Sequence, residues 1–172
     1  IRVYDILSKL VLAAHMAVES NDDATERVLE LPRFSNIATT YFLNLRLLDV
    51  AGAPVVDNFY WLSTRPDVLD YGRKVTPWEY YTPSREYADL TGLNSLPSAD
   101  VDVTCRIEKP GQIAVELANR SDTIAFFIEL LLADENTGEP IVPIFWQDNY
   151  VSLLPGQIRT IVAGLLTAAG RP

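Results

Sequence analysis

Short stretches in which apolar and polar residues alternate, each ended by a turn signal, constrain this chain more than any other feature. Side chains along a β-strand point alternately to its two faces, so such stretches predict strands with one buried face. The stretch 39–48 alternates in this way, and the Gly- and Pro-containing segment 51–54 predicts a turn before a returning strand at 55–62. Turn signals recur about every 8–12 residues, which is typical of all-β sandwiches and barrels.

The same signals divide the chain into three segments. Segment 1–63 contains candidate strands at 2–7, 9–18, 26–31, 39–48 and 55–62, of which the second could also be a buried helical turn. Segment 100–172 contains candidate strands at 100–107, 112–117, 123–133, 141–146, 150–153 and 158–165. We therefore predict an all-β chain of two immunoglobulin-like β-sandwich domains in tandem. The first is expected to be incomplete, because its pattern begins in mid-strand.

Residues 64–99 form an aromatic and proline-rich connector without a regular period, which we expect to be ordered. Residues 88–93 predict a short helical turn ending at Gly92. The aromatic side chains are either an interdomain plug or a platform for stacking sugars. Large rings bury much area at little entropic cost, which favours the plug. Exposure of the rings would discriminate the two. The candidate sugar or interdomain contacts of the whole chain are Trp78, Tyr80, Tyr81, Tyr87, Trp146 and Asp148.

Composition excludes several classes of function. A chain of 172 residues is too short for a TIM barrel of roughly 250 residues, and its formal charge of −9 disfavours nucleic acid. It contains no apolar run long enough to span a membrane and no metal-ligand spacing, so we expect no membrane, metal or cofactor. The single cysteine, Cys105, fits a small core residue on a strand better than a nucleophile, and the lone histidine, His15, has no evident catalytic partner.

Two polar sites need a separate interpretation. Glycoside hydrolysis requires two carboxylates across one sugar, for which Glu129 and Asp148 are the best placed in the sequence. The polar turn around Asp148 favours the alternative that this side chain accepts hydrogen bonds from nearby backbone N–H groups. Asn119-Arg120-Ser121 matches the three-residue acceptor pattern for N-glycosylation, which is a weak signal.

Several stretches together resemble one enzyme family. They are Phe59-Tyr60-Trp61-Leu62-Ser63, Tyr81-Thr82-Pro83, Ala88-Asp89-Leu90-Thr91-Gly92-Leu93, Ala125-Phe126-Phe127-Ile128 and the block from Pro143 to Gly156. Their order and spacing resemble the C-terminal region of family-2 glycoside hydrolases of the exo-β-D-glucosaminidase and endo-β-mannosidase type. The most specific part is Trp146-Gln147-Asp148-Asn149-Tyr150 followed by Leu153-Leu154-Pro155-Gly156.

The resemblance implies that this chain is a non-catalytic accessory module from a larger β-glycosidase. In such enzymes the acid/base and nucleophile carboxylates lie in a TIM barrel, which two immunoglobulin-like domains follow, and the reaction retains configuration. The implied partners are the catalytic barrel and other domains of the parent, with oligosaccharide as an alternative partner. The exposed edge of an incomplete first sandwich also predicts either pairing with a neighbouring chain or a distorted first unit. The resemblance leaves the compartment open, a secreted or periplasmic parent being the expectation.

Overall fold

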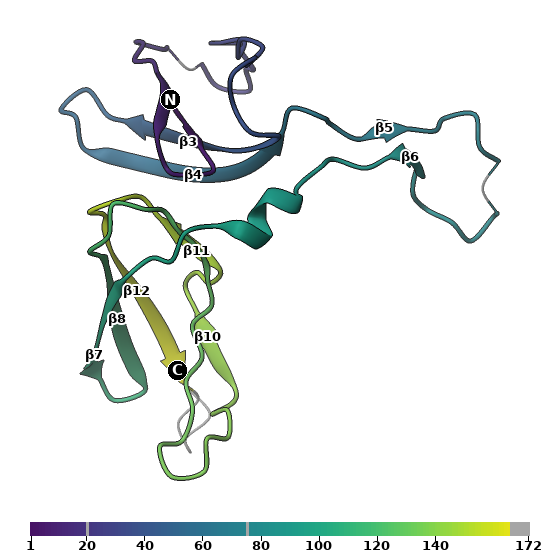
Figure 1. The fold of residues 1–172 in the computed structure, drawn as a ribbon. Helices are drawn as coiled ribbons and strands as arrows, with labels where there is room; N and C mark the ends of the chain where they lie inside the picture. Colours follow the sequence, from purple (N-terminus) through teal and green to yellow (C-terminus); the bar gives the residue numbers. More distant parts are fainter. Residues whose placement is uncertain (20, 75, 166–172) are drawn as a thin grey trace. The chain divides into compact units, whose positions relative to one another are not determined.

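The computed structural model of the chain describes residues 1–19, 21–74 and 76–165 (Figure 1). These residues are nearly all β, with one short 3₁₀ helix, which confirms the predicted fold class. The chain divides into two compact units, Ile1–Leu96 and Pro97–Pro172. The finer division into two domains and a connector at 64–99 stays a prediction.

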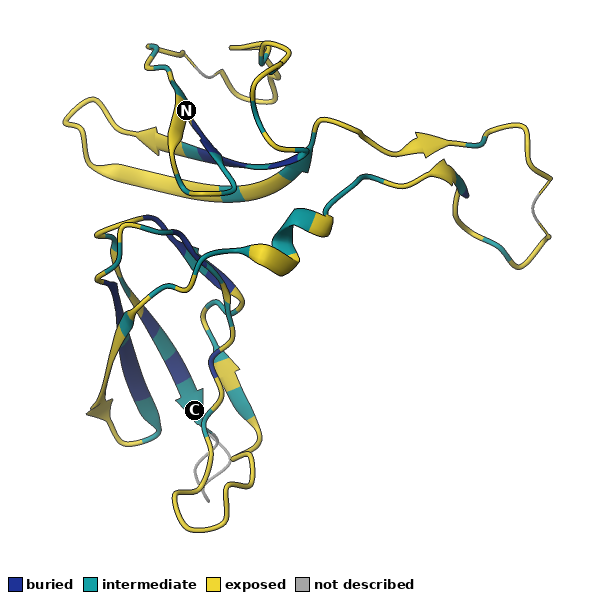
Figure 2. Cartoon of the chain, in the orientation of Figure 1, coloured by how far each residue is buried: buried dark blue, intermediate teal, exposed yellow. Residues whose placement is uncertain are grey.

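The first unit is built on a four-stranded antiparallel sheet with the order β2-β1-β3-β4. Its strands are β1 (Arg2–Asp5), β2 (Leu10–Ala13), β3 (Thr40–Leu48) and β4 (Pro54–Ser63). The centre of the sheet is buried at Val3, Phe42 and Leu43, and Val3 lies directly opposite Leu43 in the β1–β3 register. By contrast, β4 lies at an edge of the sheet and is mostly exposed (Figure 2).

The rest of the first unit is a two-stranded ribbon followed by the 3₁₀ helix. The ribbon pairs β5 (Val68–Leu69) with β6 (Ser84–Glu86), and the helix is η1 (Thr91–Ser95). The predicted turn at 88–93 is present, but it begins at Thr91 and continues past Gly92. Gly92 is closely packed: a Cβ there would lie 2.5 Å from the Ile6 Cδ1 atom and 3.0 Å from the Thr40 Oγ1 atom, so a larger residue would require these side chains to move.

The second unit is a two-layer sandwich. Its strands are β7 (Val101–Lys109), β8 (Gln112–Asn119), β9 (Ala125–Ile128), β10 (Ile144–Trp146), β11 (Val151–Leu153) and β12 (Ile158–Leu165). One sheet has the order β10-β12-β8-β7, and the other pairs β11 with β9. Leu117, Leu153 and Ile161 are almost completely buried in the core between the layers. Figure 2 shows that β8 is the most extensively buried long strand of this unit.

Three expectations from the sequence are wrong. Residues 26–31 form no strand, and residues 26–30 are exposed, because alternation alone cannot hold a strand that finds no partner for its backbone hydrogen bonds. The strand expected at 123–133 is only β9. Cys105 is exposed rather than in the core. It lies on the edge strand β7, whose Val103 is 61% exposed, because the second layer packs on β8 and β12.

Candidate functional site

The aromatic side chains of the connector are exposed. Most of them lie in the loop that joins β5 to β6, which Figure 1 shows at the end of the ribbon. Trp78 and Tyr80, in the loop between β5 and β6, are 82% and 88% exposed, and Tyr81 and Tyr87 are exposed as well. These rings are therefore available in this chain to a sugar or to another domain of a longer protein.

Glu79 organises the loop between the two most exposed rings. Its Oε2 atom accepts a hydrogen bond from the Thr76 N–H at 2.6 Å, and its Oε1 atom accepts from Arg73 at 3.2 Å and from the Tyr81 hydroxyl at 3.4 Å. The Thr76 N–H, followed by smaller contributions, lowers the pKa of Glu79 below its ordinary value. The ionised carboxylate thus fixes the loop from which Trp78 and Tyr80 project.

Asp148 is held by structural hydrogen bonds within the second unit. It accepts a hydrogen bond from Arg159 of β12 and another from the Asn149 N–H at 2.8 Å. The neighbouring Asn149 makes two hydrogen bonds to the backbone of Leu130. Its Oδ1 atom accepts from the Leu130 N–H at 2.7 Å, and its Nδ2 atom donates to the Leu130 carbonyl at 3.0 Å. Trp146, on β10, is half-buried and packs against the core of the second unit.

The sequence did not predict a group of three aromatic side chains close to Asn149 in the second unit. Phe127 and Tyr150 have positive φ values of 57° and 53°, a left-handed conformation that costs roughly 1–2 kcal/mol per non-glycine residue. Their ring centroids lie 5.2 Å apart, and the Phe126 ring stacks on Phe127 at 5.5 Å. We call Phe126, Phe127 and Tyr150 the aromatic stack. Both Phe127 and Tyr150 belong to stretches that carry the family resemblance, but a backbone angle cannot be read from a motif.

The hydroxyl of Tyr150 connects the aromatic stack to a carboxylate. It donates a hydrogen bond of 2.8 Å to the Oε1 atom of Glu129. This hydrogen bond, with the negative charge of Glu129 as a second cause, raises the pKa of Tyr150 above its ordinary value. The hydroxyl therefore remains a protonated donor at neutral pH.

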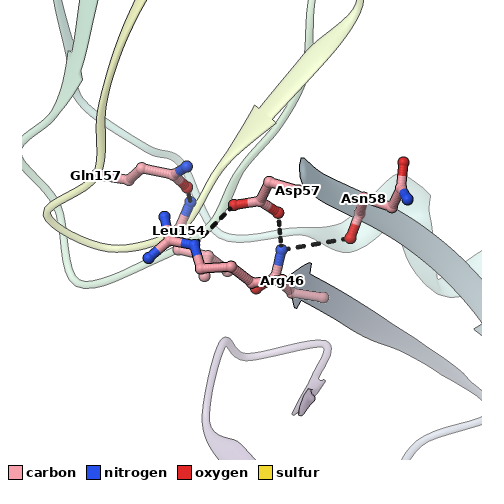
Figure 3. A network of polar contacts seen from close by, with 6 residues as sticks. Arg46, Asp57, Asn58, Leu154 and Gln157 are labelled. Carbon is pink, nitrogen blue, oxygen red and sulfur yellow. Dashed lines mark hydrogen bonds and ion pairs between the residues drawn. The ribbon is translucent and has the colours of Figure 1, made fainter. Parts of the chain in front are cut away.

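Two further polar clusters have structural explanations. In the β3–β4 hairpin, the buried Asn44 donates to the Asp57 carboxylate and to the Asn58 carbonyl, and Arg46 donates to Asp57 at 3.3 Å (Figure 3). These contacts join the two strands across their register. In the second unit Leu154 N–H donates to the Gln157 side chain at 2.9 Å, which closes the turn before β12 (Figure 3).

Asn119 is the most fully satisfied polar side chain of the second unit's core. It is 1% exposed. Its Nδ2 atom donates to the carbonyls of Thr123, Leu153 and Leu154 at 2.8, 3.1 and 3.2 Å. Its Oδ1 atom accepts from the Ser121 N–H at 3.1 Å. One side chain thus ties the end of β8 to the end of β11.

The described residues hold no group of three or more His, Cys, Asp or Glu side chains that could bind a metal ion. Among the same residues no helix is long and apolar enough to cross a bilayer.

Comparison with known proteins identifies the family to which the chain belongs. A family model described as "Exo-beta-D-glucosaminidase Ig-fold domain" matches residues 79–171, which is more than half of the chain. The chain belongs to this family. It is 40% identical over 156 residues to an exo-β-D-glucosaminidase of Streptomyces avermitilis, covering 87% of this chain and 17% of the relative. It is 48% identical over 114 residues to one from Arthroderma benhamiae, covering 66% of this chain and 13% of the relative.

Solved structures agree with the family assignment. The crystal structure of the exo-chitosanase CsxA from Amycolatopsis orientalis superimposes with a TM-score of 0.76 at 30% identity, covering 94% of this chain and 20% of that chain. The family's immunoglobulin-like fold and the resemblance to exo-β-D-glucosaminidases are thereby confirmed. The chain spans less than a fifth of the length of the curated relatives, so it corresponds to a small part of a multidomain protein.

Proposed function

We propose that this chain is a non-catalytic accessory module of a retaining exo-β-D-glucosaminidase and that it braces the catalytic barrel of its parent. The observation that carries the proposal is the family match to an immunoglobulin-like domain, combined with coverage of only 13% to 17% of two relatives with that name. The contacts of Asp148 support it too, because Arg159 and the Asn149 N–H hold this carboxylate within the second unit.

The edge strand β4 supports a bracing role. Val55, Val56 and Tyr60 are 62%, 47% and 43% exposed on this strand. Exposed apolar side chains grouped on one element are typical of surfaces that contact another protein or domain. A neighbouring domain of the parent is the proposed partner of this surface. The same edge also leaves open the self-association that an incomplete sandwich predicts, for which sedimentation of the chain is the direct measurement.

Two measurements test the proposal. The purified chain should not hydrolyse PNP-β-D-glucosamine, and turnover by the chain alone would contradict its non-catalytic role. In the full-length parent, Val56→Ser combined with Tyr60→Ser should shorten the half-life of activity at elevated temperature while leaving KM unchanged. Val50→Ser is the matched control, because Val50 is fully exposed in the hairpin turn outside the strand. Equal half-lives for the two variants would contradict bracing through β4.

A second candidate function is carbohydrate binding through the connector. The observation that favours it is the exposure of Trp78 and Tyr80 on a loop fixed by Glu79. Exposed rings on a rigid support suit stacking on the C–H face of a sugar, whereas a plug requires burial against another domain. Calorimetric titration with chito- and manno-oligosaccharides tests it. Saturable binding that Trp78→Ala or Tyr80→Ala abolishes would favour the binding module over bracing.

A further inference from the structure

Two bulky residues of the second unit share a strained backbone conformation and touch each other. In the described part of the chain only four non-glycine residues have positive φ, and Phe127 and Tyr150 are the two aromatic ones. Their ring centroids are 5.2 Å apart with 35° between the ring planes. Strain of this kind persists only where the surroundings enforce it, and it clusters at ligand clamps and other functional positions.

Hydrogen bonds to neighbouring side chains hold this conformation. The Phe127 N–H donates to the Ser152 Oγ atom at 3.1 Å, and the Tyr150 N–H donates to the Asn149 Oδ1 atom at 2.9 Å. Val151 pairs with Ile128 between the two strained positions in the β11–β9 ribbon. The two strands therefore hold both rings in place before any ligand arrives.

Core packing does not explain the strain. Phe127 and Tyr150 are 45% and 49% exposed, so the unusual backbone presents the rings to solvent instead of burying them. Exposed, preorganised aromatic rings lose little conformational entropy when they bind a partner. The arrangement thus has the properties of a binding surface.

The segment that carries the aromatic stack is acidic in sequence, and one of its carboxylates contacts the stack. Residues 121–158 contain no Lys or Arg, but they contain Asp122, Glu129, Asp134, Glu135, Glu139 and Asp148. Of these, Glu129 is joined directly to the stack through the Tyr150 hydroxyl, while Asp148 is paired with Arg159. An ionised carboxylate has about four acceptor sites, so Glu129 can accept another donor besides Tyr150. A cation next to an apolar face fits this surface.

We propose that Phe127 and Tyr150 stack on the sugar ring of a β-linked glucosaminide and that Glu129 accepts its protonated amine. The inference rests on the proposed function in one respect, because the choice of an amino sugar follows from the proposed activity of the parent. The aromatic rings supply contact with the C–H face of the sugar, and the charge-assisted hydrogen bond supplies the preference for a free amine over an N-acetyl group or a hydroxyl. This site lies in the second unit and is distinct from the connector rings Trp78 and Tyr80.

The test is a chemical-shift titration of the 172-residue chain with glucosamine, N-acetylglucosamine and glucose oligosaccharides of equal length at pH 6. We expect saturable shifts at the amides of Phe127 and Tyr150 with the glucosamine oligosaccharide. Binding of the two neutral oligosaccharides should be at least tenfold weaker. Glu129→Gln should weaken glucosamine binding by a similar factor, and Tyr150→Ala should abolish it. Phe145→Ala is the matched control, because Phe145 is 60% exposed on β10 outside the stack.

The outcomes separate this site from the proposed function. Equal affinity for charged and neutral oligosaccharides would overturn the role of Glu129. Shifts confined to Trp78 and Tyr80 would overturn the aromatic stack as the site and support the connector instead. No binding at millimolar ligand would also overturn the site, while bracing would still be decided by the half-life of the full-length parent. The amide spectrum of each variant shows whether it is folded.

Discussion

Replacing Asn119 by alanine should destabilise the second unit more than any exposed substitution in it. The side chain is 1% exposed and makes at least two hydrogen bonds through its Nδ2 atom and one through its Oδ1 atom, at buried and partly buried positions. A net contribution of about 1 kcal/mol for each bond, plus the penalty for carbonyls left without a donor, gives a loss of about 3–4 kcal/mol. A unit of this size has a total stability of roughly 4–11 kcal/mol.

Hydrogen–deuterium exchange measures this loss in the second unit alone. Peptides from β8 and β12 should exchange about 150-fold faster in Asn119→Ala, since each 1.4 kcal/mol is a factor of ten. Peptides from β3 in the first unit serve as the internal reference. Asn136→Ala is the matched control, because Asn136 lies exposed in a turn of the same unit and its side chain should contribute less than about 0.5 kcal/mol.

An acceleration of less than about threefold in Asn119→Ala would refute the reasoning, since each tenfold step corresponds to 1.4 kcal/mol. It would mean that the carbonyls of Leu153 and Leu154 find other donors when the amide is removed. Equal acceleration in β3 and β8 would contradict the independence of the two units instead. Either result is distinguishable from loss of folding, which would expose all peptides at once.

Two further predictions concern the first unit. Gly92→Ala should lower its stability by roughly 1–3 kcal/mol, because the new methyl group meets Ile6 at 2.5 Å; thermal unfolding should show no comparable effect for Gly72→Ala, whose nearest atom is at 3.5 Å. The loop held by Glu79 should be ordered above the unfolded pKa and loosen as pH falls through the lowered folded pKa. Amide exchange at Thr76 should follow this transition, and an identical pH profile in Glu79→Gln would contradict it.

The fold could be predicted from the sequence where neighbouring strands are adjacent in the chain. The β3–β4 and β7–β8 hairpins follow from alternation and turn residues alone, because the pattern and the turn agree on the same register. The strand predicted at 26–31 is wrong because a strand also needs a partner for its hydrogen bonds, and no local pattern of alternation specifies that partner. The predicted burial of Cys105 is wrong for a similar reason, because it depends on whether the second layer of the sandwich reaches the edge strand β7.

The candidate site could be predicted only in part. Trp78 and Tyr80 were identified because aromatic residues are conspicuous in composition, but their exposure follows from a loop geometry set by Glu79. The aromatic stack was missed because its defining property is a pair of backbone angles. Positive φ is a reliable inference from sequence for glycine, whereas Phe127 and Tyr150 adopt it only because contacts between distant segments require it.

The burial of Asn119 also decides what can happen to it during biosynthesis. In the folded unit its Nδ2 atom already donates to three carbonyls, so no transferase can attach an oligosaccharide there although Asn119-Arg120-Ser121 fits the acceptor pattern. Modification would have to occur on the nascent chain, and the attached glycan would then keep β8 from closing against β11. In a eukaryotic secretory host the yield of folded protein would thus depend on whether folding is faster than glycosylation of Asn119. Ser121→Ala would remove this dependence because it destroys the acceptor pattern.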